Sequence, residues 1–200
     1  MKIFKNKLAT LFTLATLIIT GCQSPVLEEK QAMITADYWQ NMESKLNKVT
    51  NITEQGRIGI INHNERGSAN FYYTFNNDKL NIELTSPIGS QIGNLDVNKE
   101  GALLNFNGQI YKEDNESLLL YKLIGFTIDK YTLNKIILGI PKEEVKRDLQ
   151  GRIIYAKTND YEIIYGDFSE FNDIAIPKEI TLKGSAETIK LKVNIVLEVK

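Results

Sequence analysis

The stretch TIKLKVNIVLEV, residues 188–199 near the carboxyl end of the chain, carries the most regular pattern in the sequence. Every second position is apolar, and the positions between hold mostly lysine, asparagine and glutamate. The apolar positions are Ile189, Leu191, Val193, Ile195, Leu197 and Val199. Successive side chains of a strand point to opposite sides of its sheet. The stretch therefore predicts one long β-strand with an apolar face on a core and a polar face in solvent.

The same period of two recurs over most of the chain from residue 54 onward. The further strand-like segments are residues 54–62, 66–75, 80–85, 91–97, 102–106, 109–112, 152–157, 161–166 and 178–183. Asn107-Gly108 joins two of them, and this dipeptide favours a tight hairpin. Many consecutive strands with short turns predict an antiparallel meander that curls into a barrel or partial barrel.

Three segments follow a helical period instead. In residues 31–49, apolar side chains recur at three- and four-residue steps, and on that stripe Trp39 is expected to pack rather than to stack on a ligand. Residues 114–124, with Asp114 as the expected cap, and residues 132–138 predict two short apolar helices. These two helices either plug the mouth of an incomplete barrel or simply complete its core. The predicted fold class is mainly β (α+β).

Composition excludes several classes of protein. The chain has 200 residues, 42% of them hydrophobic and 24% charged, which fits one globular domain with a short terminal segment. A net charge of −1 argues against a nucleic-acid binder, which needs a basic face. One Cys and one His cannot form a disulfide or a zinc site of three or four such ligands. We therefore expect no metal and no cofactor, and Cys22 with His63 is the one conceivable Cys–His pair.

The amino terminus carries a secretion signal. Three lysines precede an apolar run at residues 8–19, which is too short to span a membrane and fits the core of a signal peptide. The following Ile-Ile-Thr-Gly-Cys, residues 18–22, resembles a bacterial lipobox, in which the Cys is acylated before the leader is removed. We therefore predict a lipoprotein signal peptide at residues 1–21, a lipidated tether at residues 22–30 and Cys22 as the lipidation site. An ordinary signal peptide with an accidental Cys is the alternative.

Several short motifs, in order and at family-like spacing, are similar to those of the outer-membrane lipoprotein receptor LolB family. They are Trp39 in the first helix, Gly56-Arg57, Ala69-Asn70-Phe71, Leu84-Thr85-Ser86-Pro87-Ile88-Gly89-Ser90, Leu138-Gly139-Ile140-Pro141, Tyr165-Gly166 and Ile189-Lys190-Leu191-Lys192. The sequence departs from the family at Tyr73 and Ile136, where Trp is common, and at Ile88, where Leu is common. The resemblance covers nearly all of the chain after the signal peptide and identifies residues 31–200 as a LolB-like half-barrel domain.

The resemblance implies a fold, a location and a task. The implied fold is an incomplete antiparallel β-barrel of about eleven strands, with short helices covering its open side. The implied task is not catalysis: the protein accepts the acyl chains of client lipoproteins from the periplasmic carrier LolA and inserts these lipoproteins into the outer membrane. Gln23, standing where Asp would retain a lipoprotein in the inner membrane, implies an outer-membrane anchor that faces the periplasm. We expect a monomer.

Two groups of residues are candidates for this task. Acyl chains need a concave apolar lining, because each exposed methylene costs about 0.8 kcal/mol in water. The candidate lining residues are Phe71, Tyr73, Phe75, Leu80, Ile82, Leu84, Leu123, Ile136 and Ile137, for which ordinary core packing is equally open. The resemblance also implies that Pro87, Ile88 and Gly89 form a turn whose apolar tip enters the membrane. The alternative is that Ile88 folds back or is a tolerated exposed side chain.

Two other functions compete with a receptor. A lipase or peptidoglycan hydrolase would need a nucleophile, and the sequence has no Gly-x-Ser-x-Gly elbow. His63 lies in a polar turn where a solvated side chain is the simplest explanation, so we predict no catalytic residues. The other competitor is a scaffold lipoprotein that holds a lipid or a protein in the same half-barrel. Removal of a lipoprotein from a loaded carrier distinguishes a receptor from a scaffold.

Overall fold

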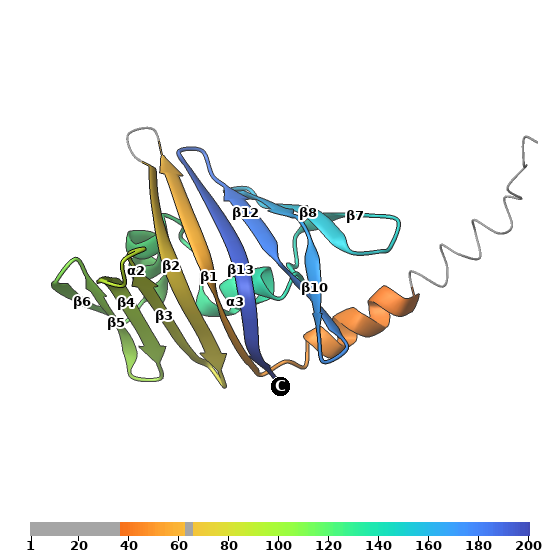
Figure 1. Cartoon of the computed structure of the whole chain (residues 1–200), viewed down its shortest axis with the longest axis horizontal. Coiled ribbons are helices and arrows are strands. Elements are labelled where there is room, and N and C mark those ends of the chain that lie inside the picture. Colours follow the sequence, from red (N-terminus) through yellow and green to blue (C-terminus); the bar gives the residue numbers. More distant parts are fainter. Residues whose placement is uncertain (1–36, 63–65) are drawn as a thin grey trace, which may run out of the picture.

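The computed structural model describes residues 37–62 and 66–200, and Figure 1 shows how its strands follow one another. The strands in these residues are β1 (Asn51–Asn62), β2 (Arg66–Asn76), β3 (Lys79–Thr85), β4 (Gln91–Asn98), β5 (Gly101–Phe106), β6 (Gln109–Glu113), β7 (Glu144–Arg147), β8 (Ile153–Lys157), β9 (Glu162–Tyr165), β10 (Phe168–Phe171), β11 (Ile174–Pro177), β12 (Glu179–Lys183) and β13 (Glu187–Val199). The helices are residues 37–46, α2 (Glu116–Ile124) and α3 (Lys130–Ile137).

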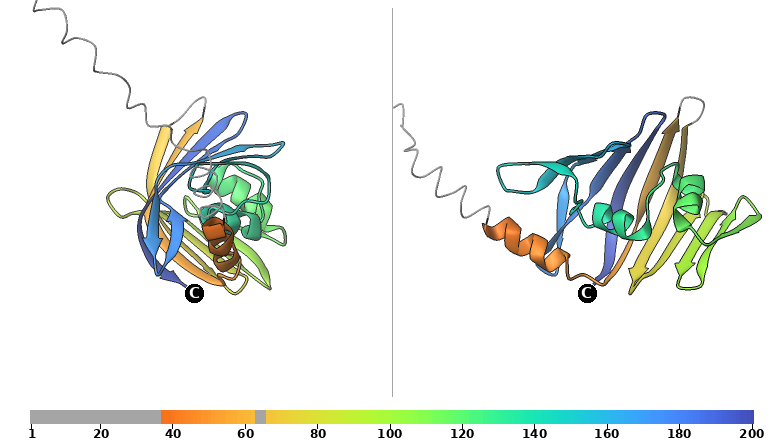
Figure 2. Two further views of the ribbon diagram at one scale, coloured as in Figure 1. Left: turned by 90° about the vertical axis from the view of Figure 1, so that its right-hand side faces the viewer. Right: turned by 180° about the vertical axis from the view of Figure 1, so that it is seen from behind.

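Eleven of the strands form one antiparallel sheet in the order β6-β5-β4-β3-β2-β1-β13-β12-β9-β8-β7. The edge strands β6 and β7 do not pair with each other, so the barrel is incomplete, as the sequence predicted. The first strand and the last strand of the chain pair in the middle of the sheet. The sheet curls around α2 and α3, which lie on its concave side (Figure 2). The predicted mainly β fold with short helices over the open side is confirmed.

The hairpin turns follow the local sequence. Asn107 and Gly108 both have positive φ, 51° and 78°, which is the geometry of a two-residue type I′ turn. Phe106 pairs with Gln109 on either side of that turn. The hairpin predicted from the dipeptide is therefore confirmed.

The predicted apolar face of the last strand is wrong at Ile195 and Leu197 and confirmed at Val199. The register between β1 and β13 shifts twice, between Gln55 and Gly56 and between Thr53 and Glu54. Each β-bulge inserts one residue, so the first bulge after Val193 reverses which side the following side chains face and the second restores the original side before Val199. Ile195 and Leu197 are consequently 47% and 48% exposed, although they alternate in phase with the buried Ile189.

The predicted helices exist with different ends. The cap of α2 is Asn115 rather than Asp114, because the Asn115 side chain accepts the Ser117 N–H at 3.0 Å. Helix α3 begins two residues earlier than predicted, because the Asp129 carboxylate accepts two main-chain N–H groups at its start.

The N-terminal helix and the β10–β11 hairpin cover one end of the molecule. The Trp39 ring packs edge-on against Phe168, with the ring centroids 6.1 Å apart, and the side chain is buried. Met42 accepts the Ala175 N–H through its sulfur at 3.4 Å. Trp39 therefore packs, as expected. The β10–β11 hairpin and β7 were not predicted, because these strands have four residues each and little alternation.

Some predictions concern residues that the structure does not describe. The signal peptide at residues 1–21, the tether at residues 22–30 with Cys22, and His63 all lie outside the described residues. No helix within residues 37–62 and 66–200 is long and apolar enough to cross a membrane.

Candidate functional site

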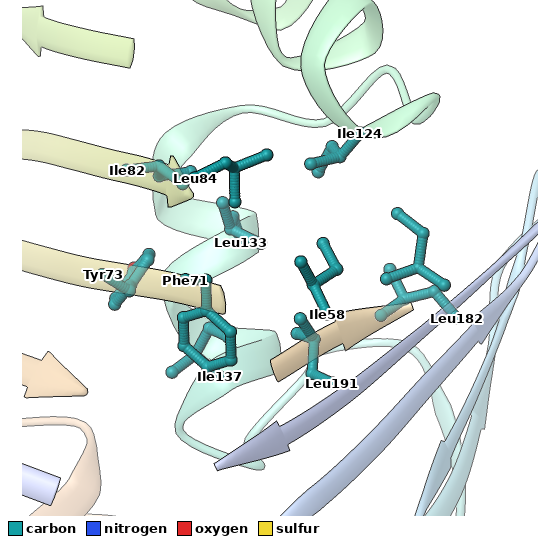
Figure 3. Close-up of a pocket in the computed structure, with 11 residues that line it drawn as sticks. Ile58, Phe71, Tyr73, Ile82, Leu84, Ile124, Leu133, Ile137, Leu182 and Leu191 are labelled. Atoms are coloured by element: carbon teal, nitrogen blue, oxygen red, sulfur yellow. The ribbon is translucent and has the colours of Figure 1, made fainter. Parts of the chain in front are cut away.

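An apolar pocket lies between the concave face of the sheet and the helices α2 and α3 (Figure 3). Its lining comes from strands β1, β2, β3, β12 and β13 and from both helices. The lining residues are Ile58, Phe71, Tyr73, Ile82, Leu84, Ile124, Leu133, Ile137, Leu182, Ile189 and Leu191. The free space is small, about 40 Å³, because these side chains nearly fill it. The lining carries no charged side chain, so the pocket suits an apolar ligand.

A second pocket of about 290 Å³ continues from the first one. The two pockets share Ile58 and Leu84. The other lining residues of the second pocket are Ile60, Asn62, Gly67, Ser68, Ala69, Ile92, Phe106 and Leu123. Leu84 and Ile92 stand on either side of the turn at residues 86–90, so this turn lies at the rim of the second pocket.

The structure brings most of the predicted lining residues together. Five of them line the first pocket: Phe71, Tyr73, Ile82, Leu84 and Ile137. Leu123 lines the second pocket. Phe75, Leu80 and Ile136 are buried and line neither pocket, so they serve the core; the Phe75 ring, for example, packs edge-on against Tyr131.

The sequence prediction omitted six of the eleven residues that line the first pocket. Two of the six, Ile124 and Leu133, lie on helices α2 and α3. Ile58, Leu182, Ile189 and Leu191 come from strands that the sequence does identify, but their place beside β2 depends on the pairing of β1 with β13 and of β13 with β12. That pairing joins distant parts of the chain, and alternation within one strand carries no information about it.

A buried carboxyl group beside the lining residue Tyr73 was also missed. Glu54 lies on β1 directly opposite Tyr73 on β2, is fully buried, and has no hydrogen-bond partner among the described residues. Burial raises the pKa of the Glu54 carboxyl from 4.5 to about 8. At neutral pH the group is therefore mostly uncharged. Extending the alternation of β1 back to the buried Ile52 would have placed Glu54 on the inward face.

Two tyrosine hydroxyls tie α3 to the sheet. Tyr73 donates to the side-chain oxygen of Asn134 at 3.1 Å, and Tyr165 donates to the main-chain oxygen of Ile136 at 3.0 Å. Burial, followed by the nearby Glu54 carboxylate, raises the pKa of Tyr73 well above its ordinary value. Both tyrosines thus stay protonated and hold the helix over the pocket.

The predicted turn is built as a rigid exposed tip. Gly89 N–H donates to the Ser86 carbonyl at 2.9 Å, and the Ser90 N–H donates to the Ser86 hydroxyl at 3.0 Å. Gly89 takes a positive φ of 86°. Ile88 is 90% exposed, so it does not fold back onto a neighbour.

The described residues contain no group of three or more His, Cys, Asp or Glu side chains that could hold a metal ion. What they do contain is an open antiparallel barrel with an apolar pocket under two helices. This arrangement defines a class of half-barrel proteins with an apolar pocket between the sheet and its covering helices.

The family follows from the sequence comparisons. The family model described as "Outer membrane lipoprotein LolB" matches residues 50–195. The chain therefore belongs to the LolB family. It is 27% identical to the outer-membrane lipoprotein LolB of Tolumonas auensis over 182 residues, which cover 89% of this chain and 90% of that protein. It is 26% identical to the LolB of Aeromonas hydrophila over 190 residues, 94% of this chain and 95% of that protein.

Solved structures with little sequence similarity share the fold. A domain from Vibrio parahaemolyticus is 7% identical with a TM-score of 0.51, over 83% of this chain and 92% of that one. A DUF1329 family protein from Desulfovibrio piger is 5% identical with a TM-score of 0.50, also over 83% and 92%. At this identity the likeness concerns the fold alone.

Family membership establishes the biological role. The protein is an outer-membrane lipoprotein, anchored in the outer membrane and facing the periplasm. It receives lipoproteins from LolA for insertion into the outer membrane. It is a transport receptor and not an enzyme.

Proposed function

We propose that the acyl chains of an incoming lipoprotein bind in the apolar pocket under α2 and α3. The observation that carries this proposal is the lining itself, in which eleven apolar or aromatic side chains from five strands and two helices converge without a charge. An acyl chain gains about 0.8 kcal/mol for each methylene that leaves water, and such a lining offers no charged group that would have to be desolvated.

Binding in this pocket requires movement. The free space of about 40 Å³ has room for little more than a water molecule, whose share of liquid volume is roughly 30 Å³. The strands of the sheet are held by continuous main-chain pairing, whereas α3 is tied to the sheet by two tyrosine hydroxyls. We infer that α2 and α3 shift outward when acyl chains enter and that the second pocket merges with the first.

The Ile88 turn then delivers the acyl chains. The turn presents an aliphatic tip at the rim of the second pocket, so a membrane reached by Ile88 lies next to the pocket opening. The lipid anchor at Cys22 and the tether at residues 22–30 keep the half-barrel, residues 31–200, near that membrane. The protein acts as a monomer, because one chain supplies the whole pocket.

The test is a transfer assay with purified protein and a LolA-type carrier loaded with lipoprotein. Leu84→Asp places a carboxylate in both pockets, and Thr85→Asp places one on the opposite side of the same strand. We expect Leu84→Asp to abolish acceptance and Thr85→Asp to retain it, since an unpaired buried carboxylate costs several kcal/mol.

Stability must be measured beside transfer. A folded Leu84→Asp protein that still removes lipoprotein from the carrier would place the acyl chains elsewhere. If Leu84→Asp does not fold, a bulkier apolar residue in the same pocket, as in Leu84→Trp, tests the same point through lost volume. Wild-type protein that binds acyl probes but never unloads a carrier would instead support the scaffold function.

A further inference from the structure

The turn between β7 and β8 presents a second isolated aliphatic side chain to solvent. Leu149 is 91% exposed, and together with Ile88 it is the most exposed large apolar side chain among the described residues. It lines neither of the two pockets described above. Neither the two pockets nor the Ile88 turn therefore explains why Leu149 is exposed.

Hydrogen bonds within the turn hold Leu149 in its exposed position. The Asp148 carboxylate accepts the main-chain N–H groups of Gln150 at 3.0 Å and Arg152 at 2.9 Å, and it accepts the Arg152 Nε–H at 2.8 Å. Arg147 donates across the turn to the Gly151 carbonyl at 2.9 Å. Four hydrogen bonds from side chains thus hold the loop so that Leu149 projects from it, as the Ser86 hydroxyl helps to do for Ile88.

The hairpin is joined to the N-terminal helix. The Arg147 guanidinium forms an ion pair with Glu43 on that helix at 3.0 Å. Figure 1 and Figure 2 show the hairpin and the helix at the same end of the long axis, while β3 and β4, which flank the Ile88 turn, lie toward the other end. At about 3.5 Å per residue, Cys22 can stand no more than roughly 50 Å from residue 37, where the described helix begins. The Leu149 turn therefore lies at the end of the described structure from which the chain leads back to Cys22.

Charge around the turn favours a lipid surface over an apolar protein groove. Residues 144–152 carry three cations, Lys146, Arg147 and Arg152, and two acids, Glu144 and Asp148. The two arginines are 35% and 39% exposed despite their ion pairs, so each can offer further N–H donors to phosphate groups. One leucine between exposed cations combines the two features by which a surface segment binds anionic bilayers.

We propose that the β7–β8 turn is a second membrane contact, in which Leu149 enters the acyl region and the flanking cations meet lipid phosphates. This inference rests on the proposed acylation of Cys22, which brings this end of the molecule to the membrane. With Ile88 at one end of the half-barrel and Leu149 at the other, two contacts fix how the pocket opening faces the bilayer. With one contact alone, the half-barrel could rotate about that contact, and the orientation of the pocket opening would not be fixed.

The test uses the full acylated protein in vesicles of phosphatidylethanolamine and phosphatidylglycerol. Cys22 is the only Cys in the chain, so acylated Leu149→Cys carries a single thiol for an environment-sensitive dye. The matched control is Glu170→Cys, an exposed polar position on the β10 strand at the same end. We expect blue-shifted emission and quenching by nitroxide-labelled lipid for the dye at 149, and neither for the dye at 170.

The outcomes separate this inference from the proposed function. Protein that floats with the vesicles while the dye at 149 behaves like the dye at 170 overturns the second contact and leaves the anchor and the pocket intact. A blue shift that requires the carrier protein, without quenching by nitroxide lipid, overturns it in favour of a protein contact. Protein that does not float overturns the anchor and this inference together, whatever the transfer assay shows.

Discussion

At the scale of single residues, the charge state of the buried Glu54 carboxyl group matters for the proposed binding of acyl chains. A carboxyl group beside the lining residue Tyr73 would oppose the entry of acyl chains if it were charged. Burial raises the pKa of this group to about 8, so the protein keeps the proton at neutral pH and the position beside Tyr73 stays mostly uncharged. The carboxyl remains destabilising, because it lacks a hydrogen-bond partner among the described residues.

The pH dependence of stability follows from this pKa. Between pH 4.5 and about 8 the folded protein holds the Glu54 proton and the unfolded chain has released it, so the free energy of unfolding falls as the pH rises. The slope from this group is about 1.4 kcal/mol per pH unit inside that window and vanishes outside it. Glu54→Gln should remove the slope and raise stability above neutral pH by one or more kcal/mol, measured by urea unfolding at several pH values.

The control for Glu54→Gln is Glu83→Gln, which changes an exposed carboxylate on β3. That variant should keep the wild-type pH profile. An unchanged profile in Glu54→Gln would mean that water or a rearranged neighbour already solvates the group.

The proposed role of Ile88 affects delivery into the membrane and not acceptance from the carrier. Ile88→Glu replaces an exposed side chain at the rim of the second pocket and removes no buried contact. Folding and acceptance from the carrier should therefore be retained. Delivery into vesicles should fall at least about tenfold, because moving such a side chain from water to an apolar phase contributes roughly 1.5–3 kcal/mol. Ser90→Glu places the same charge in the same turn without removing the aliphatic tip. Equal loss of acceptance and delivery in Ile88→Glu would contradict the assignment.

At the scale of secondary-structure elements, the proposed binding of acyl chains displaces α3. Tyr73→Phe and Tyr165→Phe each delete one hydroxyl that ties α3 to the sheet. Tyr73→Phe removes the donor to the buried Asn134 side-chain oxygen, whereas the Ile136 carbonyl still accepts the Gly139 N–H in Tyr165→Phe. Each variant should lose about 1 kcal/mol of stability. Each should also take up a fluorescent fatty-acid probe more tightly, because less free energy is needed to displace the helix. Tyr72→Phe, on the outward side of β2, is the control. Lost stability with unchanged uptake would mean that α3 stays in place during binding.

At the scale of the whole molecule, we expect the anchor and the half-barrel to have separate tasks. Cys22→Ala should abolish incorporation of labelled fatty acid and leave the protein uncleaved or soluble in the periplasm. A soluble form without the lipid should still accept lipoprotein, because the pocket belongs to the half-barrel and not to the tether. Wild-type labelling of Cys22→Ala would refute Cys22 as the acylation site, and loss of acceptance in the soluble form would contradict the division of tasks.

The sequence by itself determined the local structure and the family. Alternation predicted most strands of the main sheet, Asn107-Gly108 predicted a hairpin, and motifs such as Ser86-Pro87-Ile88-Gly89 pointed to the LolB family. These features depend on steric and hydrogen-bonding preferences within a few residues. The exposure of Ile88 could be expected for the same reason, since a turn tip has few neighbours to cover it.

Only the tertiary structure decided what faces the pocket. Two bulges turn Ile195 and Leu197 outward, and the pairing of β1 with β13 brings Ile58 beside Ile189 and Leu191. Glu54 acquires its raised pKa only when the sheet and its neighbours exclude water from it. Each of these results depends on contacts between segments far apart in the sequence. The free energy of these contacts comes from burial and strand pairing in the folded chain, so the pattern of a single strand cannot predict them.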